Sequence, residues 1–120
     1  MTLAVTLAVG LLGGVGAVGR FLLDGAVSRH AASFPWGTLA VNLSGAFLLG
    51  LLVGAAVGGD AYRFAGTGLL GSFTTFSTWM LESHRLGEDG QLRLGLANLL
   101  GSLVLGVLVA WLGRELGAAQ

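Results

Sequence analysis

The chain contains no cysteine, so both a disulfide framework and a thiolate metal site are excluded. It also has few charges: 10% of its 120 residues are Asp, Glu, Lys or Arg, against 54% hydrophobic residues. Lysine is absent, and six arginines balance six acidic residues, which gives a formal net charge of zero. This composition excludes an ordinary soluble domain and gives no sign of a nucleic-acid partner.

The few charged residues divide the chain into four long uncharged runs, each close to the roughly 20 residues that cross a hydrocarbon core of about 30 Å. The first run lacks a basic n-region and is too long for a signal-peptide core, so we expect it to remain a membrane span. The sequence therefore predicts one domain, residues 1–120, as an all-α integral membrane protein. Its expected spans are approximately Leu3–Leu23, Gly37–Gly58, Phe64–Leu81 and Leu94–Leu112. Between them we expect a short loop in which Arg29 and His30 are solvated, a tight turn over residues 58–63, and a polar loop over residues 84–93 with a turn at residues 88–90. Gly50, Gly54 and Gly58 lie four apart in span two and should form one face for close helix contact.

The arginines do not favour one orientation of these four spans. The side with the first and third loops carries Arg29, Arg85 and Arg93, with Arg20 at the end of span one. The opposite side carries Arg63, Arg114 and the terminal amine. The positive-inside rule needs a clear asymmetry, so this distribution predicts weak or dual topology.

The third uncharged run contains the most unusual stretch, GSFTTFSTW at residues 71–79. Five hydroxyl side chains fall within its seven residues 72–78. Hydroxyls can satisfy main-chain groups freed by an irregular backbone, which is tolerated in a bilayer only where protein or water surrounds it. We therefore expect a helix broken at mid-membrane that lines an ion site. The alternative is a continuous helix that uses small residues for close packing.

Other polar and aromatic residues are candidates for an ion path, although each has a structural alternative. Asn42 can donate to an anion, but an Asn in a membrane helix is more often a link between helices. Phe76, Trp79 and Glu82 are spaced by three, so we expect all three along one side of a helix. Aromatic ring edges carry positive partial charge, although such pairs usually pack in a core. Arg20 must snorkel, pair or face water, or it serves as an interface anchor.

Span four has two polar side chains, Asn98 and Ser102, which are four residues apart and face one way. Neither histidine has a neighbour at metal-ligand spacing, and no nucleophile–base pair is present, so we do not expect an enzyme. Two other function classes compete with a channel. A proton-coupled multidrug antiporter would need an embedded carboxylate, which span one lacks before Asp24. A non-transporting assembly protein would use the glycines only for packing.

Four segments together resemble the CrcB/Fluc family of small fluoride channels. They are GGVGAVGRF (13–21), PWGTLAVNLSGAFLLG (35–50), GSFTTFSTWMLE (71–82) and NLLGSLVLGVLVAWLG (98–113). One segment lies in each expected span, in the family's order. The resemblance implies a homodimer of inverted subunits in a prokaryotic-type cell membrane. Such a dimer conducts fluoride passively out of the cell and relieves fluoride toxicity.

The resemblance also implies roles for individual residues. A structural sodium ion at the dimer centre would be held by the main-chain carbonyls of Gly71 and Thr74, two from each subunit. Arg20 matches an arginine at a vestibule. The expected fluoride pore residues are Asn42, Thr75, Phe76, Thr78, Trp79, Glu82, Asn98 and Ser102.

Trp79 departs from the family, which has a second phenylalanine at this position. An indole N–H is a conventional hydrogen-bond donor, whereas a phenylalanine offers only a ring edge. We therefore hypothesise that the Trp79 N–H donates to fluoride. The alternative is that the larger ring narrows or blocks the path.

Overall fold

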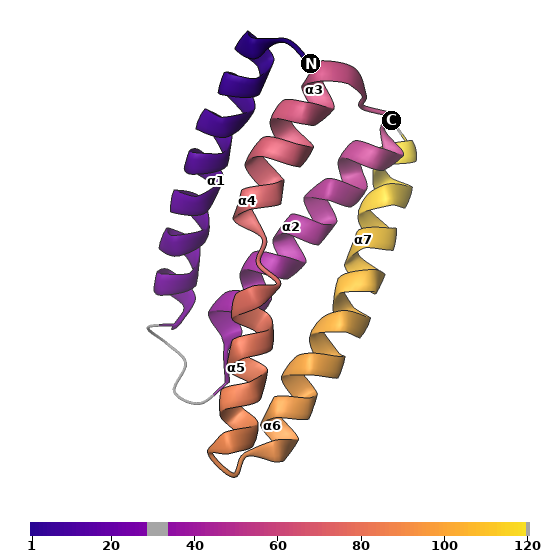
Figure 1. Ribbon diagram of the computed structural model, residues 1–120. Coiled ribbons are helices and arrows are strands. Elements are labelled where there is room, and N and C mark those ends of the chain that lie inside the picture. The colour runs from indigo at the N-terminus through magenta and orange to yellow at the C-terminus, as the bar shows by residue number, and fades with distance from the viewer. Residues whose placement is uncertain (29–33, 120) are drawn as a thin grey trace.

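The computed structural model describes residues 1–28 and 34–119, which form helices and short turns with no strand among them (Figure 1). Two of the helical segments, η1 and η2, have the wider π-type winding. The elements in chain order are α1 (Leu3–Ser28), α2 (Trp36–Gly54), α3 (Gly59–Tyr62), η1 (Arg63–Leu70), α4 (Gly71–Phe73), α5 (Ser77–Glu88), α6 (Leu92–Leu96), η2 (Ala97–Gly101) and α7 (Ser102–Ala118).

The chain passes along the long axis of the molecule four times, and its two termini lie at the same end (Figure 1). The first two passages are α1 and α2, the third joins α3 through α5, and the fourth joins α6 through α7. The longest dimension is 49 Å. A bilayer with its headgroups is about 40–45 Å thick, so the bundle is long enough to cross it.

Three passages are long and apolar enough to cross a membrane as single helices: Leu3–Ser28, Trp36–Gly54 and Leu92–Ala118. The third passage instead consists of two shorter helical stretches, 59–73 and 77–88. Large apolar side chains remain exposed along the outside of the bundle, as Leu11 (75%) and Leu108 (55%) illustrate. An apolar exterior of this extent marks a surface for lipid or protein rather than water.

Several predicted boundaries were wrong by a few residues. The first helix continues past Leu23 to Ser28, because the Ser28 hydroxyl donates to Asp24 Oδ1 one turn earlier (3.0 Å). The second helix ends at Gly54 rather than Gly58, since Ala56 takes a positive φ of 58° that no α-helix continues. The predicted solvated positions of Arg29 and His30 lie outside the described residues.

The turns around the third passage are also displaced. We expected a turn over residues 58–63, but helix α3 already begins at Gly59. We expected a polar loop over residues 84–93, but α5 continues to Glu88 and the fourth passage begins at Leu92. The predicted turn around residues 88–90 is confirmed, because Gly90 has a φ of 77° between these two helices.

Glycine allows α2 and α7 to lie in direct main-chain contact. A Cβ atom added at Gly50 or Gly54 would collide with a main-chain carbonyl of α7. A Cβ at Gly113 or Gly117 would collide in the same way with a carbonyl of α2. Close approach of this kind drives helix association in lipid, where apolar burial gives little. The glycine face predicted for span two is therefore a contact surface, although Gly58 has nothing within 4 Å.

Candidate functional site

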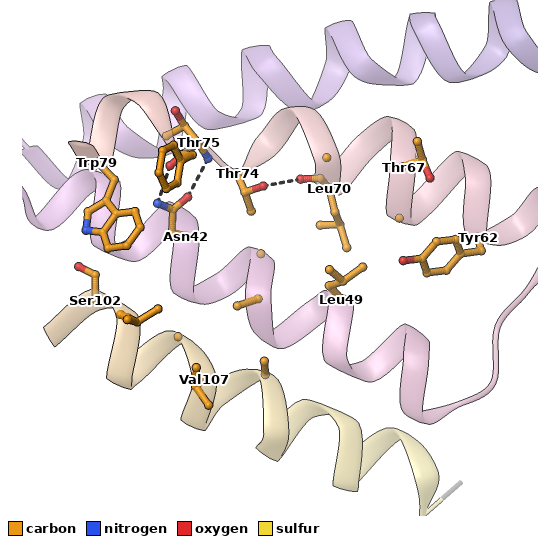
Figure 2. A pocket seen from close by; sticks show the side chains of 18 residues that line it. Asn42, Leu49, Tyr62, Thr67, Leu70, Thr74, Thr75, Trp79, Ser102 and Val107 are labelled. Carbon is orange, nitrogen blue, oxygen red and sulfur yellow. Dashed lines mark hydrogen bonds between the residues drawn. The ribbon is translucent and has the colours of Figure 1, made fainter. Parts of the chain in front are cut away.

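The helical main chain of the third passage is interrupted between Phe73 and Ser77. Thr74 is extended, with φ −80° and ψ 157°. The next residue, Thr75, is held by the side chain of Asn42 on α2 (Figure 2). Asn42 Oδ1 accepts from the Thr75 N–H, and Asn42 Nδ2 donates to the Thr75 carbonyl, each at 2.8 Å. The Thr75 N–H therefore does not make the regular helical bond to Gly71.

Hydroxyl side chains satisfy other polar groups around this interruption. The Thr74 hydroxyl donates back to the Leu70 carbonyl (3.1 Å). The Thr75 hydroxyl accepts from the Thr78 N–H at the start of α5 (3.2 Å) and donates to the Thr78 hydroxyl (3.2 Å). These local bonds are the alternative to a helical ladder that Ser and Thr offer a backbone.

A cavity of about 490 Å³ lies between α2, the third passage and α7 (Figure 2). No charged side chain lines it, and most of its wall is apolar. Seven predicted site residues contribute to this wall: Asn42, Gly71, Thr74, Thr75, Phe76, Trp79 and Ser102. The other four predicted residues, Arg20, Thr78, Glu82 and Asn98, do not line it.

The two aromatic residues at the interruption form a perpendicular pair. The ring centroids of Phe76 and Trp79 are 5.6 Å apart, and their planes meet at 82°. In this arrangement the positive edge of one ring faces the negative face of the other. Phe76 is 69% exposed, so most of its ring remains accessible from the cavity side.

The indole N–H of Trp79 is already used within the protein. Trp79 Nε1 donates to the main-chain carbonyl of Asn98 at 2.9 Å. An N–H has one hydrogen, so this bond leaves no donor for an anion. The hypothesis that the Trp79 N–H binds fluoride is therefore wrong for this conformation, and the ring itself is what Trp79 presents to the cavity.

Asn98 is fully buried and connects α5 to η2. Its Nδ2 donates to the Ser83 hydroxyl (2.8 Å), and its Oδ1 accepts from the Ser102 hydroxyl (3.3 Å). The Ser83 hydroxyl in turn donates to the Trp79 carbonyl (2.9 Å). Asn98 and Ser83 do not line the cavity, so Asn98 supports two residues of the wall, Trp79 and Ser102.

Replacing Asn98 by Ala is expected to lower the free energy of unfolding by about 1–2 kcal/mol, because the buried bonds to Ser83 and Ser102 are lost. Chemical or thermal unfolding of the purified protein measures this change. Gln91→Ala is the control, since it removes an exposed amide and should stay within about 0.5 kcal/mol of the parent. Equal stabilities of the two variants would contradict the buried network.

Glu82 and Arg20 lie apart from the cavity. Glu82 Oε1 accepts a hydrogen bond from the Thr38 hydroxyl at 2.5 Å, and Thr38 is only 2% exposed. Arg20 Nε is buried and has no hydrogen-bond partner among the described residues. The structure therefore joins Glu82 to α2 and does not bring Arg20 to the same site.

No group of three or more His, Asp or Glu residues that could hold a metal ion gathers in the described part of the chain. Main-chain oxygens are another class of cation ligand. At the interruption, the Thr75 N–H would be the regular helical donor to the Gly71 carbonyl, but it bonds to Asn42 instead. Thr74 is extended. Carbonyl oxygens of this kind suit a hard cation such as sodium.

Four polar residues that the structure brings to the site or its support were not predicted from the sequence. Tyr62 and Thr67 line the cavity, where Tyr62 lies at the opposite end from Trp79 (Figure 2). Ser83 and Thr38 are the partners of Asn98 and Glu82. A signal for Thr67 was present, since its hydroxyl stands between two glycines in an uncharged run.

Comparison with known proteins adds an independent line of evidence. Residues 7–114 match the family described as "CrcB-like protein, Camphor Resistance (CrcB)". A "Fluoride-specific ion channel FluC 2" of Mycolicibacterium paratuberculosis is 57% identical, over 96% of this chain and 95% of the relative. Another protein of this name, from Mycobacterium bovis, is 54% identical over 95% and 91%. A third, from Haloarcula marismortui, is 46% identical over 86% and 87%.

These matches span nearly the whole chain and include every helical passage. The family consists of ion channels and not enzymes, which agrees with the lack of a nucleophile–base pair in the sequence. Together with the apolar helices, they make this a multi-pass protein of the cell membrane. The chain belongs to the CrcB family.

Proposed function

We propose that this chain is a fluoride-selective channel that lets fluoride leave the cell passively and so relieves fluoride toxicity. The observation that carries the proposal is the uncharged cavity at the interrupted passage, with Phe76 and Trp79 on its wall. The names of relatives that share about half of their residues with this chain support the choice of ion.

Fluoride is small and strongly hydrated, so a selective path must replace its water with other donors. Ring edges of the perpendicular pair supply positive partial charge without a formal cation. The Asn42 amide has a second N–H beyond the one given to Thr75. The Ser102 hydroxyl lies on the same wall, but its single hydrogen is donated to Asn98 Oδ1. No lysine or arginine lines the cavity, so the anion is bound weakly enough to leave, as conduction requires.

We further propose that the channel is a homodimer of two oppositely oriented copies in the bilayer. The balanced arginine distribution permits both orientations. The apolar wall of the cavity and the exposed leucines and valines around it offer a surface for a second copy. A reporter fused to the C-terminus should then be found on both sides of the membrane, and a reporter on one side only would refute dual topology.

A structural sodium ion at the centre of this dimer completes the proposal. Gly71 and Thr74 of each copy would hold it through their carbonyl oxygens, with the interruption at mid-membrane depth. The diverted Thr75 N–H and the extended Thr74 support these ligands. The negative ends of these carbonyl dipoles would attract the cation, and ligands from both copies would thereby be held together.

Reconstitution of the purified chain into liposomes tests the function. A fluoride-selective electrode should record fluoride efflux without a proton gradient, and chloride efflux should be far slower. A requirement for a proton gradient would indicate an antiporter instead. No efflux at all from correctly inserted protein would indicate an assembly protein.

Trp79→Phe is expected to keep fluoride efflux close to the parental rate, because a ring edge stays beside Phe76. The variant loses the bond from Nε1 to the Asn98 carbonyl, which should cost about 1 kcal/mol of unfolding free energy. Efflux and thermal unfolding are measured on the same preparation. A large loss of efflux at unchanged stability would contradict the assigned role and restore the indole N–H as a fluoride donor.

A further inference from the structure

The contact between Asn42 and Thr75 links two segments that are 33 residues apart in sequence. We propose that Asn42 is a positioning residue that keeps the third passage interrupted. It does so by taking over both main-chain hydrogen bonds of Thr75. We call this pair of hydrogen bonds between Asn42 and Thr75 the clamp. The clamp also keeps the Gly71 carbonyl free for a cation, and this statement about the cation rests on the proposed sodium site.

Asparagine is suited to this role because its amide accepts at one end and donates at the other. Both ends are used on a single residue, at 2.8 Å each (Figure 2). A main-chain group left unpaired inside a bilayer is costly, since no bulk water is present to bond it. The side chain therefore lets Thr75 stay out of a helix while its N–H and carbonyl remain satisfied.

The face of α2 that carries Asn42 also fits the interruption by shape. Gly45 lies one turn after Asn42, and a Cβ atom added there would collide with the Thr74 methyl group. The extended residue thus lies directly against the main chain of α2. Helix α2 therefore supports the interruption through two independent contacts. These are the hydrogen bonds from the Asn42 amide to Thr75 and the packing of Thr74 against Gly45.

The clamp and a bound cation both favour the interrupted conformation of the third passage. Without the amide, the nearest regular acceptor for the Thr75 N–H is the Gly71 carbonyl four residues earlier. A helical bond there would occupy an oxygen that the sodium ion needs. Loss of Asn42 should therefore weaken sodium binding, although its own atoms are not among the proposed sodium ligands.

Sodium-dependent stability tests this coupling. We compare the melting temperature of the purified dimer in sodium with that in the large cation N-methylglucamine, for the parent, Asn42→Ala and Ser44→Ala. Ser44 is a matched control, because its hydroxyl bonds only to carbonyls of its own helix, at Ala40 and Val41. The parent and Ser44→Ala should gain stability in sodium, and Asn42→Ala should lose that gain.

Two results are distinguishable. A parent without any sodium-dependent shift would refute the sodium part of the proposed function. A shift in the parent that Asn42→Ala retains in full would overturn the coupling proposed here, whatever happens to fluoride efflux.

Hydrogen exchange tests the clamp without reference to sodium. The Thr75 amide should exchange slowly in the parent and in Ser44→Ala. It should exchange faster in Asn42→Ala, whose unclamped segment moves between conformations. Asn42→Leu keeps roughly the volume but can bond neither the Thr75 N–H nor its carbonyl, so its Thr75 amide should also exchange faster, and this variant carries the test if the alanine variant does not fold. Exchange as slow as that of the parent in either variant would overturn the clamp.

Discussion

Replacing Phe76 by Ile is expected to abolish fluoride efflux while the protein still assembles. Isoleucine keeps an apolar side chain but has no ring, so the positive edge that Phe76 offers to the anion and its perpendicular pairing with Trp79 are both lost. We expect the rate to fall on the order of 100-fold, which corresponds to a barrier increase of about 3 kcal/mol. Efflux from liposomes is read with a fluoride electrode, and size-exclusion chromatography checks assembly.

Phe21→Ile is the matched control for this experiment. Phe21 is 74% exposed on α1 and does not line the cavity, so the same chemical change there should leave efflux close to the parental rate. Normal efflux in Phe76→Ile would reject the aromatic site. Loss of efflux in both variants would show that the effect does not come from the cavity.

The all-helical membrane architecture could be predicted because the bilayer sets the length of an uncharged run. The third passage also carried a local signal, since hydroxyls concentrate where Thr74 is extended and Thr75 bonds to Asn42. Placement of this segment at mid-membrane, the inverted dimer and the sodium ion stay predictions. The carbonyls of Gly71 and Thr74 at the interruption support the sodium ion, and the even distribution of arginines between the two sides supports the inverted dimer.

The partners of the polar residues could not be predicted, because they depend on how each helix is rotated against its neighbours. Trp79 was expected to offer a donor to an anion, yet its indole N–H bonds to the main chain of Asn98. For Asn42 the alternative of a link between helices is confirmed, since its amide bonds to the main chain of Thr75. In each case the partner is far away in sequence. A pattern within one helix contains no information about such a pair.

The spacing argument for Glu82 shows a second limit of local patterns. Residues three apart differ by about 300° around a helix of 3.6 residues per turn. Two such steps place Glu82 about 120° away from Phe76, so the three side chains do not share one face. The carboxylate accordingly reaches Thr38 on α2, while Phe76 and Trp79 line the cavity.

Gly113→Ala is expected to destabilise the protein strongly, because its Cβ would collide with the Phe47 carbonyl of α2. This is a contact with main chain, which cannot rotate away as a side chain can. The α2 and α7 helices must move apart, and we expect a loss of about 3 kcal/mol in unfolding free energy. Thermal unfolding of the purified protein measures it.

The same substitution at Gly101, also in the fourth passage, should have the opposite sign. A Cβ there meets nothing within 4 Å, and alanine favours a helix over glycine by about 1 kcal/mol. Gly101→Ala should therefore match or exceed the parental stability. If both variants lose stability equally, the glycines act through main-chain flexibility instead. A loss of stability confined to Gly113→Ala would show that direct main-chain contact holds α7 against α2. Because α7 carries Ser102 and other residues of the cavity wall, the same contact would fix the position of that wall.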